Sequence, residues 1–288
     1  MLTERPADVI SSPGIDAIVI ATPVRSHFDL AVASLRAGKH VLVEKPLTST
    51  SEQALALMEE AEQRRLVLMV DHTYVFAPAI RAIADTVRSQ ELGDLWYWDS
   101  ARLNLGLIRD DANVVWDLAS HDFGILDHVL PIAPSALKAV GMTPRGGGRE
   151  YLAHINLHYP GGFLAHIHAS WISPIKVRRT MIGGSRRMLV YDDDLANKVA
   201  IHDCGFDPGS PNGDGVRYRR GEVKNIPLET AEPLFRAVEH FAMCVTESRR
   251  PITDGEAGLR IVRLLEATDE SLELGGQIVS LDAEGVAV

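Results

Sequence analysis

The fold is decided by residues 38–47, GKHVLVEKPL, and by the pattern on either side of them. Residues 41–43 are continuously apolar, as in a strand that is buried on both faces. The run ends in Glu44-Lys45-Pro46, where proline fixes φ and removes a backbone donor. Ligands of open α/β sheets bind outside the carboxyl ends of the strands, so a lysine here can point at a bound small molecule. The tripeptide alone leaves open an ordinary surface lysine in front of a helix.

Strands and helices alternate around this segment. Residues 16–21, DAIVIA, predict a second buried strand, and residues 66–70 predict a third. Amphipathic helices are predicted between them, over residues 27–37 and 51–64, and Gly38 suits the left-handed position that ends a helix. This alternation implies right-handed crossovers and a small parallel α/β sheet, which we assign to a first domain, residues 1–72.

The pattern changes after about residue 72. Residues 151–159 and 163–171 alternate apolar and polar around Pro160-Gly161-Gly162, which predicts a hairpin. Other strands are predicted over 95–103, 177–182, 188–191 and 198–202, helices over 77–87, within 112–130, and over 233–248 and 255–274, and a loop over 203–215. We therefore expect a second domain, residues 73–288, with a larger, mostly antiparallel sheet and with its last helices packing back.

Composition limits the classes of function. The chain has 288 residues, 46% of them hydrophobic, and a net charge of −10, so it supports a large core but no surface for nucleic acid or anionic membranes. No apolar run reaches the roughly 18 residues of a membrane span. Two cysteines, Cys204 and Cys244, form no disulfide framework and suggest reduced thiols in the cytoplasm. The expected partners are small molecules and other copies of the chain.

A second chemical segment is DLASH, residues 117–121. On a helix, Asp117 and His121 stand four residues apart and share a face. A carboxylate beside an imidazole orients the ring and raises its basicity, which suits a general acid or base near neutral pH. An ion pair on a solvated helix, or a helix cap at Asp117, is the alternative that this spacing leaves open.

Taken together, these segments resemble one family. ATP at residues 21–23, His27, GKHVLVEKPL and DLASH follow one another in the order found in the Gfo/Idh/MocA family of NAD(P)-dependent oxidoreductases. SWISP at residues 170–174 and PITDG at residues 251–255 are also similar to that family, so the resemblance covers nearly the whole chain. It implies an incomplete Rossmann-like parallel sheet followed by a larger open-faced sheet, through which a homodimer or homotetramer would form.

The resemblance also implies the site. Lys45, Asp117 and His121 correspond to the family's catalytic residues, and the Lys45–Pro46 peptide is expected to be cis. The residues expected near the cofactor are Thr22, Pro23, His27, Glu44 and Lys45, and those expected near the substrate are Lys45, Arg102, Asn104, Arg109, Asp117 and His121. Oxidation of a secondary alcohol removes a hydride and a proton; NAD or NADP takes the hydride, a histidine base takes the proton, and a lysine ammonium stabilises the alkoxide.

One family motif is not found in this sequence. The Gly-x-Gly-x-x-Gly turn that cradles a dinucleotide pyrophosphate should precede residue 16, and the nearest glycine cluster is at residues 146–148. We therefore expect that the true start lies upstream, which puts cofactor binding by this chain in question. The alternatives are a cofactor-free ligand-binding form of the same fold, and a partner chain that supplies the missing strands.

Four histidines on the predicted hairpin suggest a competing hypothesis. His154 and His158 share one strand face, and so do His166 and His168. Such a cluster suits a transition metal and would indicate a metal-dependent lyase or isomerase. No carboxylate has matching spacing nearby, and histidines are common on half-exposed strands. The sequence therefore predicts no metal site.

Overall fold

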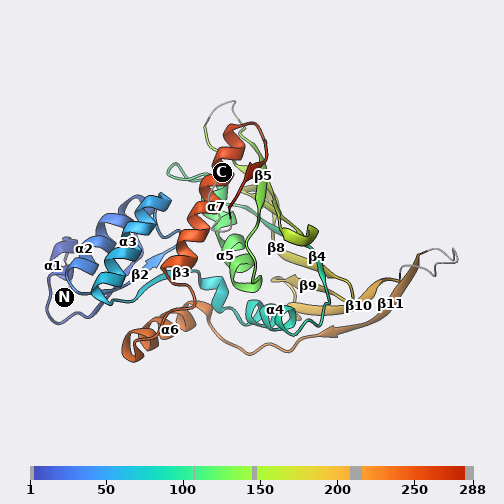
Figure 1. Cartoon of the computed structure of the whole chain (residues 1–288), viewed down its shortest axis with the longest axis horizontal. Coiled ribbons are helices and arrows are strands. Elements are labelled where there is room, and N and C mark those ends of the chain that lie inside the picture. Colours follow the sequence, from blue (N-terminus) through green and yellow to red (C-terminus); the bar gives the residue numbers. More distant parts are fainter. Residues whose placement is uncertain (1–2, 107, 145–147, 208–215, 283–288) are drawn as a thin grey trace. The chain divides into compact units, whose positions relative to one another are not determined.

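The computed structural model describes residues 3–106, 108–144, 148–207 and 216–282 (Figure 1). Contacts divide the chain into two compact units. Unit 1 comprises Met1–Ala77 and Ala231–Glu266, and unit 2 comprises Pro78–Thr230 and Ala267–Val288. The sequence-based division into residues 1–72 and 73–288 stays a prediction, and the contacts place the first boundary after Ala77.

Unit 1 is built on a sheet of three strands, β1 (Ala17–Ile20), β2 (His40–Glu44) and β3 (Leu68–Asp71). The strands lie in the order β1-β2-β3 and all pair in parallel. The three middle residues of β2 are fully buried, as their apolar run predicts. The parallel α/β sheet expected from the sequence is confirmed.

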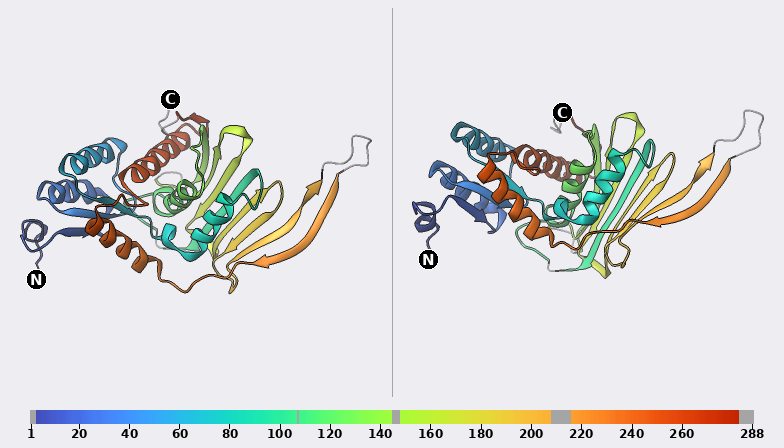
Figure 2. Two further views of the ribbon diagram at one scale, coloured as in Figure 1. Left: turned by 60° about the horizontal axis from the view of Figure 1, so that its bottom comes forward. Right: turned by 90° about the horizontal axis from the view of Figure 1, so that it is seen from below.

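Helices cover both faces of this sheet. The helices of unit 1 are α1 (Pro6–Ile10), α2 (His27–Arg36), α3 (Ser51–Arg64), α6 (Pro233–Glu247) and the first part of α7 (Gly255–Glu273). Figure 2 shows α2 and α3 on one face and α6 on the other. Gly38 follows α2 with φ 78°, the left-handed conformation predicted for it. Thr50 caps α3, its hydroxyl accepting a hydrogen bond of 3.3 Å from the Gln53 N–H.

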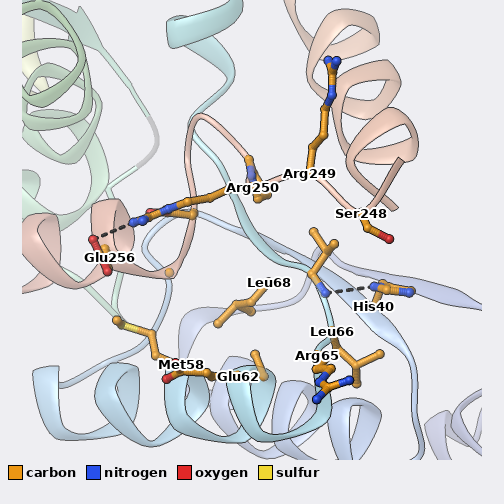
Figure 3. A pocket seen from close by; sticks show the side chains of 15 residues that line it. His40, Met58, Glu62, Arg65, Leu66, Leu68, Ser248, Arg249, Arg250 and Glu256 are labelled. Carbon is orange, nitrogen blue, oxygen red and sulfur yellow. Dashed lines mark hydrogen bonds and ion pairs between the residues drawn. The ribbon is translucent and has the colours of Figure 1, made fainter. Parts of the chain in front are cut away.

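A pocket of about 560 Å³ opens in unit 1 beside the amino ends of β2 and β3 (Figure 3). Its walls come from the start of both strands, from the end of α3, and from the segment that joins α6 to α7. It therefore lies at the edge of the sheet opposite to Glu44 and Asp71, the residues that end β2 and β3.

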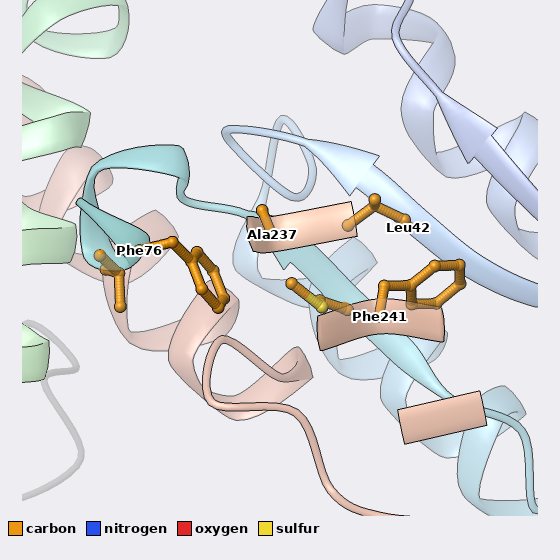
Figure 4. Packing of buried hydrophobic residues seen from close by; sticks show 6 residues of the cluster. Leu42, Phe76, Ala237 and Phe241 are labelled. Carbon is orange, nitrogen blue, oxygen red and sulfur yellow. The ribbon is translucent and has the colours of Figure 1, made fainter. Parts of the chain in front are cut away.

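The core of unit 1 joins distant parts of the sequence. Leu42, Met69, Phe76 and Val75 pack with Ala237 and Phe241 of α6 (Figure 4). The strand residues come from β2 and β3, and the next two come from a 3-10 turn, η2 (Thr73–Phe76). Helix α6 thus completes a core that the first 77 residues leave open on one side.

Unit 2 contains a sheet of nine strands, in the order β11-β10-β9-β8-β4-β7-β6-β5-β12. The strands are β4 (Leu95–Leu105), β5 (Ala136–Met142), β6 (Leu152–His158), β7 (Leu164–Ser170), β8 (Ile172–Gly184), β9 (Met188–Asp192), β10 (Val199–Asp207), β11 (Arg217–Asn225) and β12 (Val279–Ser280). Strands β4 and β7 are parallel, and the other neighbours are antiparallel. Helices α4 (Pro78–Arg88) and α5 (Ser120–Val129) lie over one face (Figure 2). The hairpin predicted from residues 151–171 is confirmed as β6 and β7.

The prediction of a loop over residues 203–215 was wrong in part. Strand β10 continues through Asp207 and pairs with β11, which the sequence did not predict. Residues 208–215 lie outside the described residues. The side chains of β11 are exposed along almost its whole length, so it has no alternation of apolar and polar residues to reveal it. Figure 1 shows β10 and β11 continuing past the other strands of the sheet.

No helix in the part of the chain that the structure describes is long and apolar enough to cross a membrane. Both cysteines are free thiols; Cys244 is buried in α6, and Cys204 is half-buried on β10.

Candidate active site

The carboxyl edge of the unit 1 sheet gathers three short polar segments. Thr22 and Pro23 follow β1, Lys45 follows β2, and His72 follows β3. Because the three strands are parallel, these segments meet at one edge, where open α/β sheets bind their ligands. The Lys45–Pro46 peptide is cis, as the family resemblance implies.

His27 joins two of these segments. Its ring is buried, with Nδ1 2.9 Å from the carbonyl oxygen of Pro46 and Nε2 2.7 Å from that of Thr22. The imidazole thus connects the loop after β1 to the loop after β2. Thr22 remains exposed, its hydroxyl 2.7 Å from that of Ser26. The predicted cofactor contacts of these residues stay predictions, and the geometry favours a positioning role for His27.

Asp71 and His72, at the end of β3, were not predicted from the sequence as residues of the site. Asp71 pairs with Glu44 in the strand register, and the Thr73 hydroxyl donates a hydrogen bond of 2.8 Å to its carboxylate. Burial raises the pKa of Asp71 to about 6, and the neighbouring Glu44 carboxylate adds to the shift. Their place at the carboxyl end of a third parallel strand was the signal that could have revealed this pair, Asp71 and His72.

His72 is a buried, neutral neighbour of Lys45. Burial lowers the pKa of His72 to about 3, and the Lys45 ammonium lowers it further. Neither ring nitrogen has a hydrogen-bond partner among the residues that the structure describes. A neutral imidazole beside the lysine adds no positive charge, so the ammonium of Lys45 keeps its attraction for an oxyanion.

In unit 2, Asp117 lies in a π-helical turn, η3 (Val115–Ala119), and His121 lies in the first turn of α5. Such turns are frequent at functional sites because they change the direction of side chains within a helix. The predicted pairing of Asp117 with His121 on one face of a regular helix stays a prediction. The regular helix itself is wrong for residues 115–119, because the backbone there takes the wider turn.

Trp171 and Arg109 are among the side chains that hold the Asp117 carboxylate. The Nε1–H of the buried Trp171 donates a hydrogen bond of 2.9 Å to Oδ2. The Nη1 of Arg109 lies 3.9 Å from Oδ1, and the same guanidinium makes two hydrogen bonds of 2.9 Å to Asp111. Arg109, predicted as a substrate contact, is therefore beside Asp117. Trp171 was named in the sequence only as part of a family motif.

The η3 turn is held from outside. The side-chain oxygen of Asn113 accepts hydrogen bonds of 3.1 Å from the N–H groups of Val115 and Trp116. The carboxylate of Asp269 in α7 accepts a hydrogen bond of 2.9 Å from the Asn113 amide and one of 2.6 Å from the Trp116 indole. A carboxylate distant in sequence thus fixes the residues that precede Asp117. The single sequence shows no signal for this contact.

Arg102 and Asn104 lie on β4. Arg102 is buried, and its Nε donates a hydrogen bond of 2.7 Å to the buried Asp122 of α5. The carbonyl oxygen of the Asn104 amide is buried and has no hydrogen-bond partner in the described part of the chain. Substrate contact by these two residues stays a prediction, and the buried pair favours a structural role for Arg102.

The histidines of β6 and β7 form a cluster without metal geometry. His154 lies 3.2 Å from His166 by their ring nitrogens, and His166 lies 2.9 Å from Asp99 of β4. The rings of His154 and His168 stack at 4.1 Å, and burial lowers the pKa of His168 to about 4. His158 is exposed at the far end of β6. No group of three or more histidine, cysteine or acidic side chains in the described residues is arranged to hold a metal ion.

The predicted catalytic residues are divided between the units. Lys45 belongs to unit 1, and Asp117 and His121 belong to unit 2. Within unit 1 the structure brings together Lys45 and His72, and within unit 2 it brings together Asp117, Arg109 and Trp171. The assembly of both sets into one site stays a prediction.

Comparison with protein-family models matches both parts of the chain. Residues 2–72 match the model described as "Oxidoreductase family, NAD-binding Rossmann fold". Residues 80–190 match the Gfo/Idh/MocA C-terminal domain. The reservation about the cofactor that the missing glycine motif raised finds no support in these matches.

Individual curated proteins and solved structures are also similar to this chain. The chain is 30% identical to UDP-N-acetylglucosamine 3-dehydrogenase of Acidithiobacillus ferrooxidans, over 86% of this chain and 76% of that protein. It is 23% identical to scyllo-inositol 2-dehydrogenase (NAD(+)) of Bacillus subtilis, over 98% of this chain and 82% of that protein. A crystal form of the Acidithiobacillus enzyme superposes with a TM-score of 0.79 and 26% identity, over 95% of this chain and 83% of that one. An inositol dehydrogenase homologue from Azotobacter vinelandii, solved with NADH and myo-inositol, shares the fold. Its TM-score is 0.79 and its identity 23%, over 96% of this chain and 80% of that one.

Proposed function

Because this chain belongs to the Gfo/Idh/MocA family of oxidoreductases, we propose that it interconverts a secondary alcohol and a ketone on a sugar-like substrate with NAD or NADP. The substrate classes proposed are a sugar, a cyclitol or a nucleotide sugar, in line with the names of its relatives. The observation that carries the proposal is the position of Lys45, at the carboxyl end of a buried parallel strand in the part that matches an NAD-binding model.

The residues present fit the nicotinamide side of a dinucleotide. The exposed Thr22–Pro23 loop and Lys45 share one sheet edge, and His27 holds the two loops together. When bound, the nicotinamide supplies the hydride acceptor or donor, which no side chain can replace. Glu44, Thr22, Pro23 and His27 are the residues that we propose to line that part of the site.

In the proposed reaction, the side chains of the protein stabilise the charge on the substrate oxygen and accept its proton. Lys45 would stabilise the alkoxide oxygen of the substrate through its ammonium, with a neutral His72 beside it. His121 would accept the hydroxyl proton, and Asp117, held by Trp171 and Arg109, would orient substrate and base. These roles require Lys45 of one unit and the pair of the other to meet at the substrate.

Titration with NADH and with NADPH, followed by a substrate panel, tests this function. We expect saturable binding of one cofactor and turnover of a cyclitol, a free sugar or a UDP-linked sugar. Lys45→Met and His121→Gln should each lower kcat by about 10²–10⁴-fold. Exposed residues of unit 2, in the variants Lys138→Met and His158→Gln, are the matched controls. Absence of saturable binding of either cofactor would favour the cofactor-free form of the fold.

We also propose a homodimer or homotetramer that forms through the large sheet, in a reducing cytoplasm. The free thiols Cys204 and Cys244 support the compartment. Half-exposed side chains on the sheet, including those of the histidine cluster, provide a surface that an identical partner can cover. Light scattering after gel filtration should give a mass of two or four times 31.5 kDa. A single 31.5 kDa species at high protein concentration would contradict this assembly.

A further inference from the structure

A second ligand site is indicated at the other edge of the unit 1 sheet. The pocket there has a volume of about 560 Å³, within the usual range for small-molecule sites. His40 begins β2 and Glu44 ends it, so the two edges are roughly 13 Å apart along that strand. The pocket is therefore separate from Lys45 and from the residues that we propose to contact the cofactor.

The floor of the pocket is apolar. Met58 and Ala61 of α3 line it together with Leu66, Val67 and Leu68. Met58, Leu66 and Val67 are only half-buried, so they leave apolar surface in contact with water. An apolar ligand body that covers this surface would gain from its removal from water.

Three hydrogen-bond donors stand at one end of this floor. Figure 3 shows Arg65, His40 and Ser248 on the same side of the pocket, around Leu66. Nδ1 of His40 accepts a hydrogen bond of 2.9 Å from the Val67 N–H, so the neutral ring carries its proton on Nε2. The side chains of Arg65 and Ser248 make no hydrogen bond or ion pair with any other residue that the structure describes.

The other two arginines of the pocket are already compensated, whereas the carboxylate of Glu62, which also lines the pocket, makes no ion pair with the residues that the structure describes. Arg250 forms ion pairs with Asp254 and with Glu256, and Arg249 lies 3.0 Å from Glu247. Figure 3 shows the Arg250–Glu256 pair at the end opposite to the three donors. The uncompensated donor end is thus built around one arginine, and such an end suits the oxygens of an anion.

The backbone gives an independent reason to regard this end as functional. Arg65 has φ 56° and Ser248 has φ 53°, the left-handed conformation in which helices usually place glycine. Only Gln90 shares this conformation among the non-glycine residues in the described ranges, and it lies outside the pocket. Two of the three therefore place a donor at the rim of one pocket, and unfavourable backbone of this kind recurs at ligand clamps.

We propose that this pocket binds a small organic anion, with a carboxylate or phosphate head on Arg65, His40 and Ser248 and an apolar body on Met58 and Leu66. The ligand class follows from the donors at one end and the apolar floor beyond them. The site is independent of the oxidoreductase activity proposed above.

NMR titration of the full chain with hexanoate, hexyl phosphate and inorganic phosphate tests the site. One of the two amphipathic probes should shift the amide signals of His40 and Val67 saturably, with Kd near or below about 1 mM. Inorganic phosphate, which lacks the apolar body, should bind at least about 10-fold more weakly. The two amphipathic probes distinguish a carboxylate head from a phosphate head.

Three glycine variants distinguish the loss of a ligand contact from the removal of an unfavourable left-handed backbone conformation. Arg65→Gly and Ser248→Gly should weaken the probe by about 10-fold or more, while Tm stays the same or rises by up to about 3 °C. Gln90→Gly should show the same stability change without a change in probe affinity, because Gln90 is the matched left-handed residue elsewhere. Equal probe affinity in all three variants, or no saturable shift with either amphipathic probe, would overturn the proposal.

Discussion

At the scale of single residues, the chemistry depends on how a few side chains are held. Asp117 is fixed by the indole of Trp171 at 2.9 Å and by Arg109 at 3.9 Å. Lys45 has a neutral histidine beside it, because burial keeps the pKa of His72 at about 3. A lysine, an aspartate and a histidine were visible in the sequence, but the groups that hold them were not.

Loss of the Trp171 indole N–H should impair turnover more than it impairs folding. In Trp171→Phe the buried ring remains, but Asp117 loses a donor; a hydrogen bond to a charged group contributes about 1.5–3 kcal/mol. We expect kcat/KM to fall about 10-fold or more, with cofactor Kd unchanged. Trp98→Phe is the control, since the Trp98 ring is equally buried and its Nε1 has no partner among the described residues. Equal activity losses in both variants would show that packing alone explains the effect.

Asp71 should make the protein less stable as pH rises through the acid range. Its pKa is about 6 in the folded protein and near 3.8 when unfolded, so the folded state binds more protons between these values. The contribution of Asp71 to the stability of the folded protein is therefore greatest below about pH 4 and is lost by about pH 6. Asp71→Asn should be more stable than the parent at pH 7, by about 1–2 kcal/mol, with little difference at pH 4.

Chemical denaturation at several pH values measures the Asp71 effect. The exposed Asp85 of α4 provides the control variant Asp85→Asn, which removes a carboxylate from the surface of the protein. A constant difference for Asp71→Asn between about pH 4 and pH 6 would contradict the raised pKa.

At the scale of elements, β4 and α5 are joined by a buried ion pair. Arg102 and Asp122 are only 8% and 4% exposed in their side chains, with 2.7 Å between Nε and Oδ2. Strand β4 occupies the middle of the sheet and is paired on both sides, and α5 contains His121. The pair therefore fixes the helix that bears a proposed catalytic residue against the sheet of the same unit.

Removal of one partner of this pair should be costly. Asp122→Leu leaves the buried guanidinium without its carboxylate, and we expect a loss of about 3–5 kcal/mol in the free energy of unfolding. The double variant Arg102→Met with Asp122→Leu should recover most of that loss, because no buried charge remains. The exposed pair Arg88 and Asp85 should contribute less than about 1 kcal/mol in the same denaturation experiment. A double variant as unstable as Asp122→Leu would contradict this account.

At the scale of the whole molecule, each unit is built from two separate stretches of the chain. Thr253 accepts a hydrogen bond of 2.8 Å from the Val70 N–H, and Glu266 accepts one of 2.8 Å from the Ser51 N–H. Phe241 and Ala237 close the core over Leu42 and Met69 (Figure 4). Unit 1 is therefore complete only with residues 231–266.

A fragment of residues 1–77 should not fold cooperatively by itself. Without α6, the apolar surface of Leu42, Met69 and Phe76 is exposed to water. Residues 1–77 joined to residues 231–266 by a flexible glycine-serine linker should recover a cooperative thermal transition, followed by circular dichroism. A cooperative transition of residues 1–77 alone would show that α6 is dispensable.

The sequence by itself determined the elements with clear periodicity. Apolar runs gave the parallel strands β1 to β3, and alternation around a Pro-Gly-Gly turn gave the hairpin β6–β7. The order of short motifs indicated the family, and it selected Lys45, Asp117 and His121 as candidates. These signals are local, so a single sequence is enough to read them.

Only the tertiary structure decided which residues hold these candidates. Asp269 supports the residues before Asp117, His27 connects two loops, and burial gives Asp71 and His72 their shifted pKa values. It also showed β11, whose exposed side chains carry no pattern, and the pocket in which Arg65 and Ser248 stand in the left-handed conformation. Burial and contacts between distant residues cause these features, and neither is encoded in local periodicity.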